Sequence, residues 1–157
     1  MSGFRRGVRL GIDVGRARVG VARCDPDGML AVPVETVQRG DASIDRILDI
    51  AKEYDLLEFV VGLPVNMQGA DTASTTDARE FAAALQHRSG APVRLVDERL
   101  STVTAHAALR SSGRSQKKSR SIVDQVAAVV LLQQAIDTEK STGNPAGATI
   151  PVDEEPA

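Results

Sequence analysis

Apolar runs separated by turn-forming residues fill the first third of the chain. The runs cover residues 8–13, 18–24 and 30–37, and the gaps at 15–17 and 25–28 contain Gly, Asp and Pro. Runs of this length that include Val, Ile and Leu, bounded by such residues, are typical of β-strands. Connections this short join antiparallel neighbours. The pattern therefore predicts a three-stranded antiparallel meander.

Helical and strand patterns alternate over the rest of the chain. Ile44, Ile47, Leu48 and Ala51 recur at helical spacing, which predicts a helix over Ser43–Tyr54. The remaining predicted elements are strands at 59–63 and 93–97, a helix between them that ends at Gly90, a short helix at 102–109 and a long, mostly apolar helix at 122–136.

This order of elements is that of an RNase H-like α/β fold. It predicts a central mixed five-stranded sheet flanked by helices, in which the fourth and fifth strands run parallel to the first. Alternation along the first strand places Arg9, Gly11 and Asp13 on one face, and Leu10 and Ile12 on the other. Ligands of α/β proteins usually bind at the carboxyl ends of such strands.

Composition narrows the class of protein. The chain has 157 residues and a formal net charge of −2, so overall charge neither indicates nor excludes a nucleic-acid partner. Because neither a secretory signal nor an apolar stretch of membrane-spanning length is recognisable, we expect a cytoplasmic protein with no membrane partner. The expected organisation is a flexible N-terminus at 1–7, one RNase H-like domain at 8–137 and a disordered acidic tail at 138–157.

Cys24 is the single cysteine, which excludes an internal disulfide and a cysteine-based zinc site. Two interpretations of this residue stay open. It is either a small, half-buried side chain at the end of a strand or a surface thiol that could cross-link two subunits. The sequence leaves both a monomer and a homodimer open.

Three carboxylates far apart in the sequence fall at the ends of predicted apolar elements. Asp13 ends the first strand, Glu98 follows the fifth, and Asp124 opens the last helix. A carboxylate at the end of a buried element carries a desolvation cost. A divalent cation offsets that cost, since Mg²⁺ and Mn²⁺ prefer hard oxygen ligands. The leading hypothesis is therefore a hydrolytic metal site formed by these three residues.

Each carboxylate also has a purely structural interpretation. Asp13 could accept a backbone hydrogen bond at a strand-to-turn junction. Glu98 could form an exposed ion pair with Arg99, which would contribute little. Ser121 and Asp124 fit a capping box at the start of the last helix.

Candidate nucleic-acid contacts come from local charge. Five basic residues lie within eleven positions, interleaved with serines, just before Asp124: Arg110, Arg114, Lys117, Lys118 and Arg120. Such a segment can neutralise phosphates without reading sequence, or it can be a solvated linker. Arg16, Arg18 and Arg99 lie near the predicted carboxylate site and are secondary candidates. The loop at 64–75, which contains Asn66, could shape a substrate groove or only cap the next helix through Thr75 or Thr76.

Four short motifs, taken in order, resemble those of the YqgF/RuvX family of RNase H-like nucleases. They are Leu10–Gly15 with Val19–Ala22, Val61–Gly69, Asp97–Thr102 and Val123–Ala128, and the resemblance extends over nearly all of residues 8–137. Gln68 and the turn Arg16–Arg18 depart from the family pattern. These departures put substrate preference in doubt more than the chemistry.

The resemblance implies a specific activity and site. Asp13, Glu98 and Asp124 match the catalytic carboxylates proposed for the family, which implies a nuclease that uses Mg²⁺ or Mn²⁺ in a two-metal reaction. It implies a role in maturing precursor 16S rRNA. It also implies, as an alternative, the resolution of four-way DNA junctions by a dimer, by similarity to the RuvC resolvases.

Two other classes of function stay open. Gly11–Gly15 also resembles the first phosphate motif of the actin and sugar-kinase superfamily, although Arg16 stands where those proteins have Thr or Ser. That superfamily pairs two domains around a nucleotide, and this chain has room for one. The second possibility is an RNA-binding ribosome-assembly factor that cleaves nothing.

Overall fold

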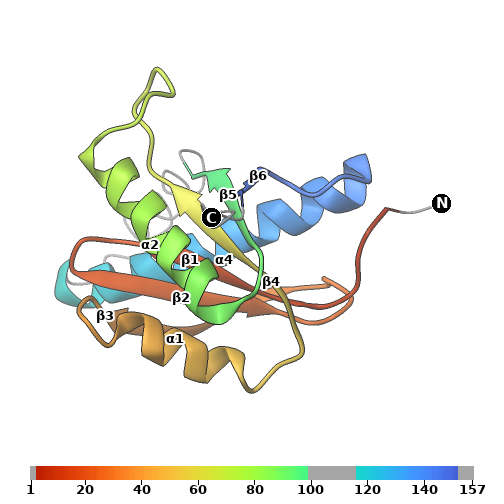
Figure 1. Cartoon of the computed structure of the whole chain (residues 1–157), viewed down its shortest axis with the longest axis horizontal. Coiled ribbons are helices and arrows are strands. Elements are labelled where there is room, and N and C mark those ends of the chain that lie inside the picture. The colour runs from red at the N-terminus through yellow and green to blue at the C-terminus, as the bar shows by residue number, and fades with distance from the viewer. Residues whose placement is uncertain (1–2, 99–115, 152–157) are drawn as a thin grey trace, which may run out of the picture.

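The structure is a computed structural model that describes residues 3–98 and 116–151, with side chains placed for residues 3–98 and 125–151. Its elements in chain order are β1 (Val8–Val14), β2 (Arg18–Cys24), β3 (Ala31–Gln38), α1 (Ser43–Ala51), β4 (Leu56–Leu63), α2 (Ala73–Ser89), β5 (Val93–Asp97), α4 (Gln116–Thr142) and β6 (Ala148–Thr149) (Figure 1). The helix predicted at 102–109 lies outside the described residues.

The strands form one mixed sheet in the order β3-β2-β1-β4-β5-β6. β1, β2 and β3 are an antiparallel meander, and β4 and β5 run parallel to β1. This confirms the predicted RNase H-like fold. β6, which the sequence did not predict, pairs antiparallel with β5 and extends the sheet by a sixth, very short strand.

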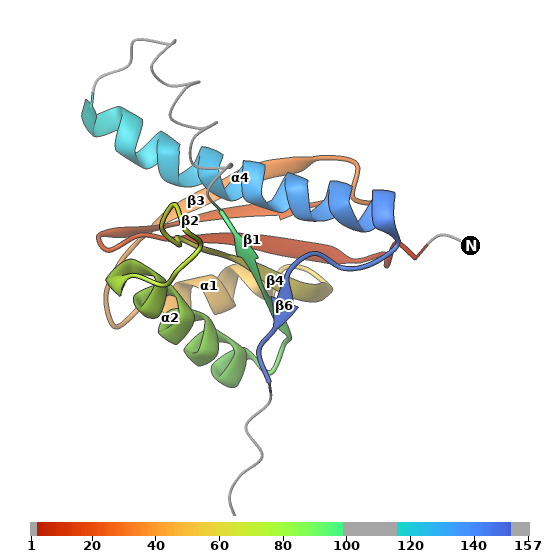
Figure 2. The ribbon, with the colours of Figure 1, turned by 90° about the horizontal axis from the view of Figure 1, so that it is seen from above.

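Helices cover both faces of the sheet. Figure 2 shows α4 lying across one face and α1 with α2 against the other. The core on the α1 and α2 side includes Ile12, Phe59 and Leu85, whereas Val60 and Leu132 belong to the core beneath α4. Two apolar layers therefore enclose the sheet, as an α/β fold requires.

Strand alternation puts polar and small residues on the α4 face. On β1 this face carries Arg9, Gly11 and Asp13, because Leu10 and Ile12 pack into the opposite core. Gly11 allows α4 to lie close to the sheet. A Cβ at this position would stand 2.8 Å from both the Ala128 carbonyl oxygen and Leu132 Cβ. The glycine thus fixes the contact between β1 and α4.

A buried ion network ties this face to the far end of α4. Arg9 and Glu139 are 1 % and 2 % exposed, and Arg9 Nη2 donates to Glu139 Oε2 at 3.2 Å. Arg5 donates to both Glu58 and Glu139, and its backbone N–H also donates to Glu139 at 2.8 Å. Two cations and two carboxylates therefore neutralise one another inside the fold.

The structure differs from the sequence prediction at both ends of the chain. The segment at 1–7 was expected to be flexible, yet Arg5 is held by the ion network and Gly7 N–H donates to the Pro26 carbonyl at 2.9 Å. The tail expected from residue 138 instead contains the end of α4 and the whole of β6. Arg94 Nε holds the connection between these two elements by donating to the Ala146 carbonyl at 2.7 Å.

Cys24 is fully buried, so the interpretation as a cross-linking surface thiol is wrong. The backbone N–H of Arg9 donates to its sulfur at 3.3 Å. Burial raises the pKa of the thiol, and the residue packs against the α4 side of the core. Among the described helices, none is both long enough and apolar enough to cross a bilayer.

Candidate active site

Parallel pairing brings the ends of β1 and β5 to either side of β4. Asp13 is the penultimate residue of β1, and Glu98 directly follows β5. The backbone N–H of Glu98 donates to the Leu63 carbonyl at the end of β4, at 3.3 Å. The two predicted carboxylates, 85 positions apart in sequence, therefore emerge at the same edge of the sheet.

The carboxyl groups of Asp13 and Glu98 are hydrogen-bonded to each other. Glu98 is only 7 % exposed, whereas Asp13 is half-buried. Burial, followed by the negative charge of Asp13 and its hydrogen bond, raises the pKa of Glu98 to about 9. A pKa this high keeps Glu98 protonated at neutral pH, so the hydrogen-bonded pair shares one proton.

A glycine on β4 makes the space for this pair. A Cβ at Gly62 would lie well inside 3.0 Å of Glu98 Oε2, so any larger residue would displace the carboxyl group. Oε2 itself is buried and has no hydrogen-bond partner among the described residues. A buried carboxylate oxygen without a donor is costly, and its position beside a second carboxyl group is what a hard cation would satisfy.

Asp124 lies on α4, but not where the sequence placed it. The helix begins at Gln116, so Asp124 is in the third turn, and the alternative interpretation as a capping box with Ser121 is wrong. Its side chain lies outside the described side chains. Its backbone is one turn before Ala128, the residue that packs on Gly11.

The described carboxylates give two of the three expected ligands. In the part of the chain with placed side chains, His, Cys, Asp and Glu residues do not gather in threes around a metal position. Asp13 and Glu98 remain as a pair of hard oxygen donors at the sheet edge. The chemistry of these two carboxyl groups fits Mg²⁺ or Mn²⁺. A third protein ligand would have to come from another residue.

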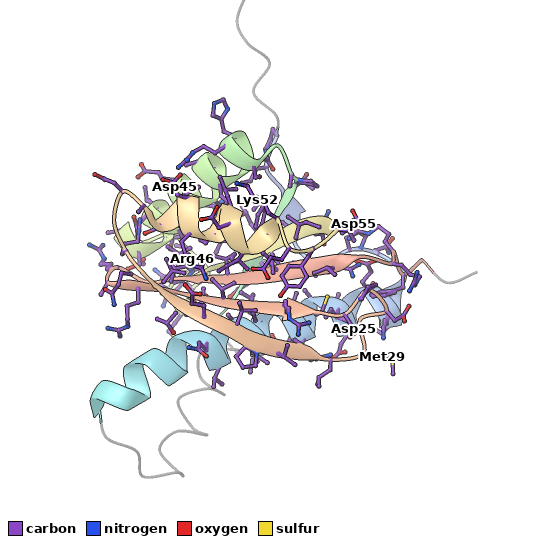
Figure 3. All side chains as sticks on the ribbon, turned by 90° about the horizontal axis from the view of Figure 1, so that it is seen from below. Asp25, Met29, Asp45, Arg46, Lys52 and Asp55 are labelled. Carbon is purple, nitrogen blue, oxygen red and sulfur yellow. The ribbon has the colours of Figure 1, made fainter. Side chains whose placement is uncertain are left out.

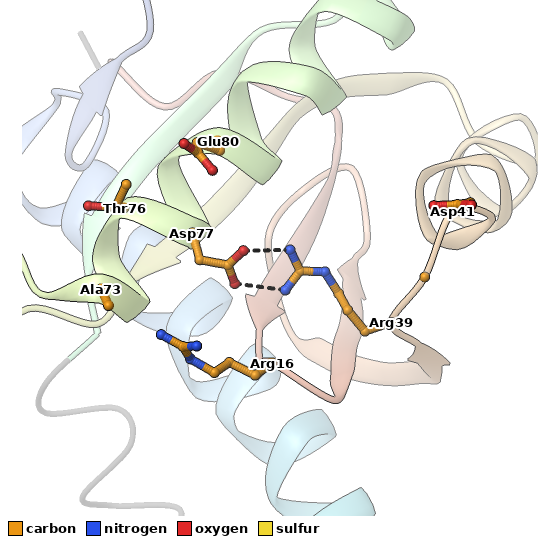
Figure 4. A pocket seen from close by; sticks show the side chains of 8 residues that line it. Arg16, Arg39, Asp41, Ala73, Thr76, Asp77 and Glu80 are labelled. Atoms are coloured by element: carbon orange, nitrogen blue, oxygen red, sulfur yellow. Dashed lines mark hydrogen bonds and ion pairs between the residues drawn. The ribbon is translucent and has the colours of Figure 1, made fainter.

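A groove of about 720 Å³ lies beside this edge, on the α2 side of the β1–β2 turn. Figure 4 shows Arg39 paired with Asp77 of α2, and the Arg16 side chain extending past them. Arg39 donates to both oxygens of Asp77, at 2.8 and 2.7 Å, and to the Gly15 carbonyl at 2.9 Å. The hydrogen bonds from Arg39 lower the pKa of Asp77, and the positive charge of Arg16 lowers it further. Arg39 is therefore committed to the scaffold, and Arg16 is the exposed cation of the groove.

The other predicted nucleic-acid contacts fall into two groups. Arg18 is half-buried on β2, and Asn66 is exposed in the β4–α2 loop, where its side chain orders a turn. The rest lie outside the described side chains: Arg99, Arg110, Arg114, Lys117, Lys118 and Arg120. Lys117, Lys118 and Arg120 belong to α4, so the alternative of a solvated linker does not hold for these three residues.

Two residues of this region were not expected from the sequence: Gly62 as a site residue and Thr72 as the cap of α2. Thr72 is the N-cap of α2, and its Oγ1 accepts from the Thr75 backbone N–H at 3.4 Å. Thr75 Oγ1 donates to the Pro64 carbonyl at 2.6 Å. A glycine inside an otherwise apolar strand signals close approach of another group, and Gly62 follows Val60 and Val61 in such a strand. That signal was available.

Comparison with known proteins places the chain among relatives of the same size. A protein of Clavibacter michiganensis is 55% identical over 151 residues, covering 94% of each chain, and one of Streptomyces coelicolor is 49% identical over 152 residues, covering 95% of this chain and 91% of the relative. Both bear the name "Putative pre-16S rRNA nuclease".

The same fold occurs in a solved structure of Thermus thermophilus RuvC in complex with a Holliday junction substrate. It superposes with a TM-score of 0.54 at 17% sequence identity and covers 88% of this chain and 98% of the other. The family model described as "RuvX: Holliday junction resolvase" matches residues 7–138. With most of its length matched by that model and by relatives at about half identity, the chain belongs to the RuvX (YqgF/RuvX) family.

Proposed function

We propose that the protein is a metal-dependent endonuclease that hydrolyses phosphodiester bonds during maturation of the 5′ end of precursor 16S rRNA. One observation carries the proposal most directly. Asp13 and Glu98 meet at the edge of the sheet as a buried carboxyl pair, and one oxygen of Glu98 has no hydrogen-bond partner among the described residues. A protein seldom keeps such a pair without a ligand that requires it.

Asp13 and Glu98 would hold Mg²⁺ or Mn²⁺ through their carboxylate oxygens. Bound metal would supply an activated water and compensate the charge that grows on the phosphate, with two ions where a third carboxylate is present. Asp13 is suited to the central position because β1 lies inside the sheet, paired with both β2 and β4. Glu98 must lose its proton to act as a ligand. Gly62 leaves the space that its carboxyl group occupies.

Asp124 is proposed as the third ligand. Its helix crosses the sheet antiparallel to β1, as the course of the two elements in Figure 2 indicates. Four helical residues from Ala128 back to Asp124 advance about 6 Å. Two strand residues from Gly11 to Asp13 advance about 6.6 Å. Since Ala128 packs on Gly11, this register supports a position of Asp124 level with Asp13.

The choice of substrate rests on the relatives. Their name refers to precursor 16S rRNA, and identities near 50% over almost the whole chain favour a shared substrate. The family description instead names a Holliday junction resolvase, which favours a four-way DNA junction as the alternative. Arg16 would contact substrate phosphates at the sheet edge in either case, because phosphate contacts do not depend on sequence.

The test is cleavage of two labelled substrates, a precursor rRNA fragment that spans the 5′ end of 16S rRNA and a four-way DNA junction. Each is incubated with Mg²⁺, with Mn²⁺ and with EDTA. We expect cleavage of the RNA that requires metal and leaves the junction intact. Cleavage of the junction alone would replace the proposal with the resolvase alternative. Binding of the RNA without cleavage in either metal would favour an assembly factor.

A further inference from the structure

Two glutamines bond α4, which lies across one face of the sheet, to the strand β3 (Figure 2). Gln125 Nε2 donates to Thr36 Oγ1 at 2.8 Å, and Gln133 Oε1 accepts from the Ala31 backbone N–H at 2.9 Å. The two glutamines are separated by about 12 Å along the helix. The Gln125 bond is the one nearer to the candidate active site, because Gln125 directly follows Asp124.

The bond of Gln125 reaches the sheet on the row of residues that contains Asp13. Thr36 is paired with Gly20 of β2, and Gly20 is paired with Asp13 of β1. Paired residues face the same side of the sheet. This is the α4 side, because Ala22, two positions after Gly20, packs in the core beneath α4. Two strand spacings, roughly 10 Å, separate Thr36 from Asp13. The bond therefore fixes α4 at the level of Asp13.

Opposite sides of α4 face different strands. Polar residues on one side bond to β3 or to the connection before it: Gln125, Gln133 and Lys140. Residues on the other side line a cavity of about 330 Å³ against Val96 and Asp97 of β5: Leu131, Gln134 and Thr138. The buried Ala128 lies between these two sides and faces the sheet. The contacts thus define a β3 side and a β5 side of the helix.

The helical repeat assigns Asp124 to the β5 side. Successive residues turn by about 100°, so Asp124 and Leu131 lie within about 20° of each other around the axis. Relative to Ala128, position 124 is turned by about 40° toward β5, and Gln125 by about 60° toward β3. The bond that draws Gln125 to β3 therefore holds position 124 on the side of β1 and β5, where the carboxyl pair lies.

Apolar packing constrains the rotation of α4 only weakly near this point. Among the side chains that the structure describes, Ala127 and Ala128 are the buried residues closest to position 124. The larger buried residues Leu131 and Leu132 follow about two turns after that position. Methyl groups interlock less deeply with a sheet than leucine side chains do. A hydrogen bond is directional, so Gln125 supplies the constraint that the alanines do not.

We propose that Gln125 is a positioning residue, whose bond to Thr36 fixes the rotation of α4 that turns position 124 toward Asp13 and a bound metal. The proposal rests on the metal site proposed above and names a contact that completes it. A helix with side chains has a radius of about 5 Å, so a rotation of about 20° displaces its outer atoms by roughly 2 Å. Metal–ligand distances tolerate only about 0.2 Å. Loss of the bond should therefore weaken metal binding while the protein still folds.

The experiment measures Mn²⁺ binding to the full chain by calorimetry. Gln125→Met keeps the length of the side chain and removes its amide, and should weaken Mn²⁺ binding about tenfold. Thr36→Val removes the hydroxyl group at nearly constant shape and should weaken binding equally. Thr36→Ser keeps the hydroxyl group and should retain the wild-type affinity. Gln125→Met and Thr36→Val together should weaken binding no more than either alone, because both remove the same bond.

Two comparisons separate positioning from a loss of stability. Gln133→Met removes the matched bond to β3 about two turns further along the helix. It should lower the free energy of unfolding in urea about as much as Gln125→Met does, yet leave the Mn²⁺ affinity unchanged. In protein that carries Asp124→Asn, Gln125→Met should cause no further loss of Mn²⁺ affinity, because the bond acts through that carboxylate.

Cleavage of the precursor rRNA fragment gives a second readout. At a low, fixed Mn²⁺ concentration, Gln125→Met should slow single-turnover cleavage about tenfold, and a higher Mn²⁺ concentration should restore the rate. The RNA concentration that gives half of the maximal rate should stay within about twofold of the wild type, because phosphate contacts supply most of the affinity for RNA.

Wild-type Mn²⁺ affinity in Gln125→Met would overturn the proposal and leave the nuclease function standing. An equal loss in Gln133→Met, or a further loss in the presence of Asp124→Asn, would also overturn it, because the bond would then only stabilise the fold. Absence of Mn²⁺ binding by the wild type would overturn both proposals. Mn²⁺ binding that depends on Gln125 through Asp124, without cleavage of either substrate, would support the positioning role and remove the nuclease function.

Discussion

Because Gly62 of β4 has no side chain, the carboxyl group of Glu98 occupies the volume beside its Cα. A strand residue with any side chain at position 62 would meet Glu98 Oε2 and push it away from Asp13. The buried carboxyl pair therefore depends on a residue that carries no functional group, and on the parallel pairing of β4 with β5 that sets Gly62 opposite Val96.

Gly62→Ala should strongly reduce activity while the protein still folds. The added methyl group must displace Glu98, which we expect to reduce metal affinity and cleavage by about a hundredfold at a cost of about 1–3 kcal/mol in stability. Metal titration and urea unfolding measure the two effects. Gly40→Ala is the control, because a Cβ there meets nothing within 4 Å. Full activity in Gly62→Ala would show that Glu98 need not occupy this position.

Glu98→Gln should change how the stability of the metal-free protein depends on pH. The folded state raises the pKa of Glu98 from 4.5 to about 9, so folded protein binds this proton more tightly than unfolded protein. The wild type therefore loses about 1.4 kcal/mol of stability per pH unit, relative to the variant, as pH rises from about 4.5 to about 9. Urea unfolding in EDTA at several pH values measures the difference. Curves that run parallel across this window would contradict the shared proton.

Metal binding should release a proton. Because the Asp13–Glu98 pair holds one proton at neutral pH, a cation that binds both carboxylates must displace about one proton at pH 7.5. Calorimetry of Mn²⁺ binding in buffers of different ionisation enthalpy gives that number. Affinity should rise with pH up to about 9. Release of no proton by the wild type would mean that the metal binds elsewhere or that the pair is already ionised.

Glu139→Ala should destabilise the fold without altering the site directly. It leaves Arg9, which is 1 % exposed, without its α4 partner. Removing one side of a buried ion pair costs about 3–5 kcal/mol. Glu53→Ala, on the exposed surface after α1, should cost under about 0.5 kcal/mol. Thermal and urea unfolding compare them, and equal stabilities would mean that the network contributes nothing to the fold.

Much of the fold and part of the site follow from residue patterns. The meander at 8–37, the parallel strands and the faces of Asp13 and Glu98 come from alternation and turn residues, which are local. Asp13 and Glu98 meet because parallel strands share a carboxyl edge, a rule that topology supplies once the fold is known.

Long-range partners were not predictable in the same way. Arg5 and Glu139 stand 134 positions apart, and no local pattern joins them. Their pairing orders both chain ends, which by composition resemble disordered segments. The start of α4 was also misjudged, because Ser121 and Asp124 imitate a capping box inside a helix that begins at Gln116.

The most direct measurement of the central claim is the single-turnover rate of RNA cleavage in saturating Mg²⁺ for the wild type, Asp13→Asn and Asp55→Asn. Asp55, which Figure 3 labels, is exposed directly before β4, whereas Glu98 is hydrogen-bonded to Leu63 at the other end of that strand. Its replacement should leave the rate within about twofold. Asp13→Asn, checked for folding, should lose at least about a thousandfold, equivalent to about 4 kcal/mol of transition-state stabilisation. A rate in Asp13→Asn above about a tenth of the wild type would contradict a metal-dependent nuclease site at Asp13 and Glu98.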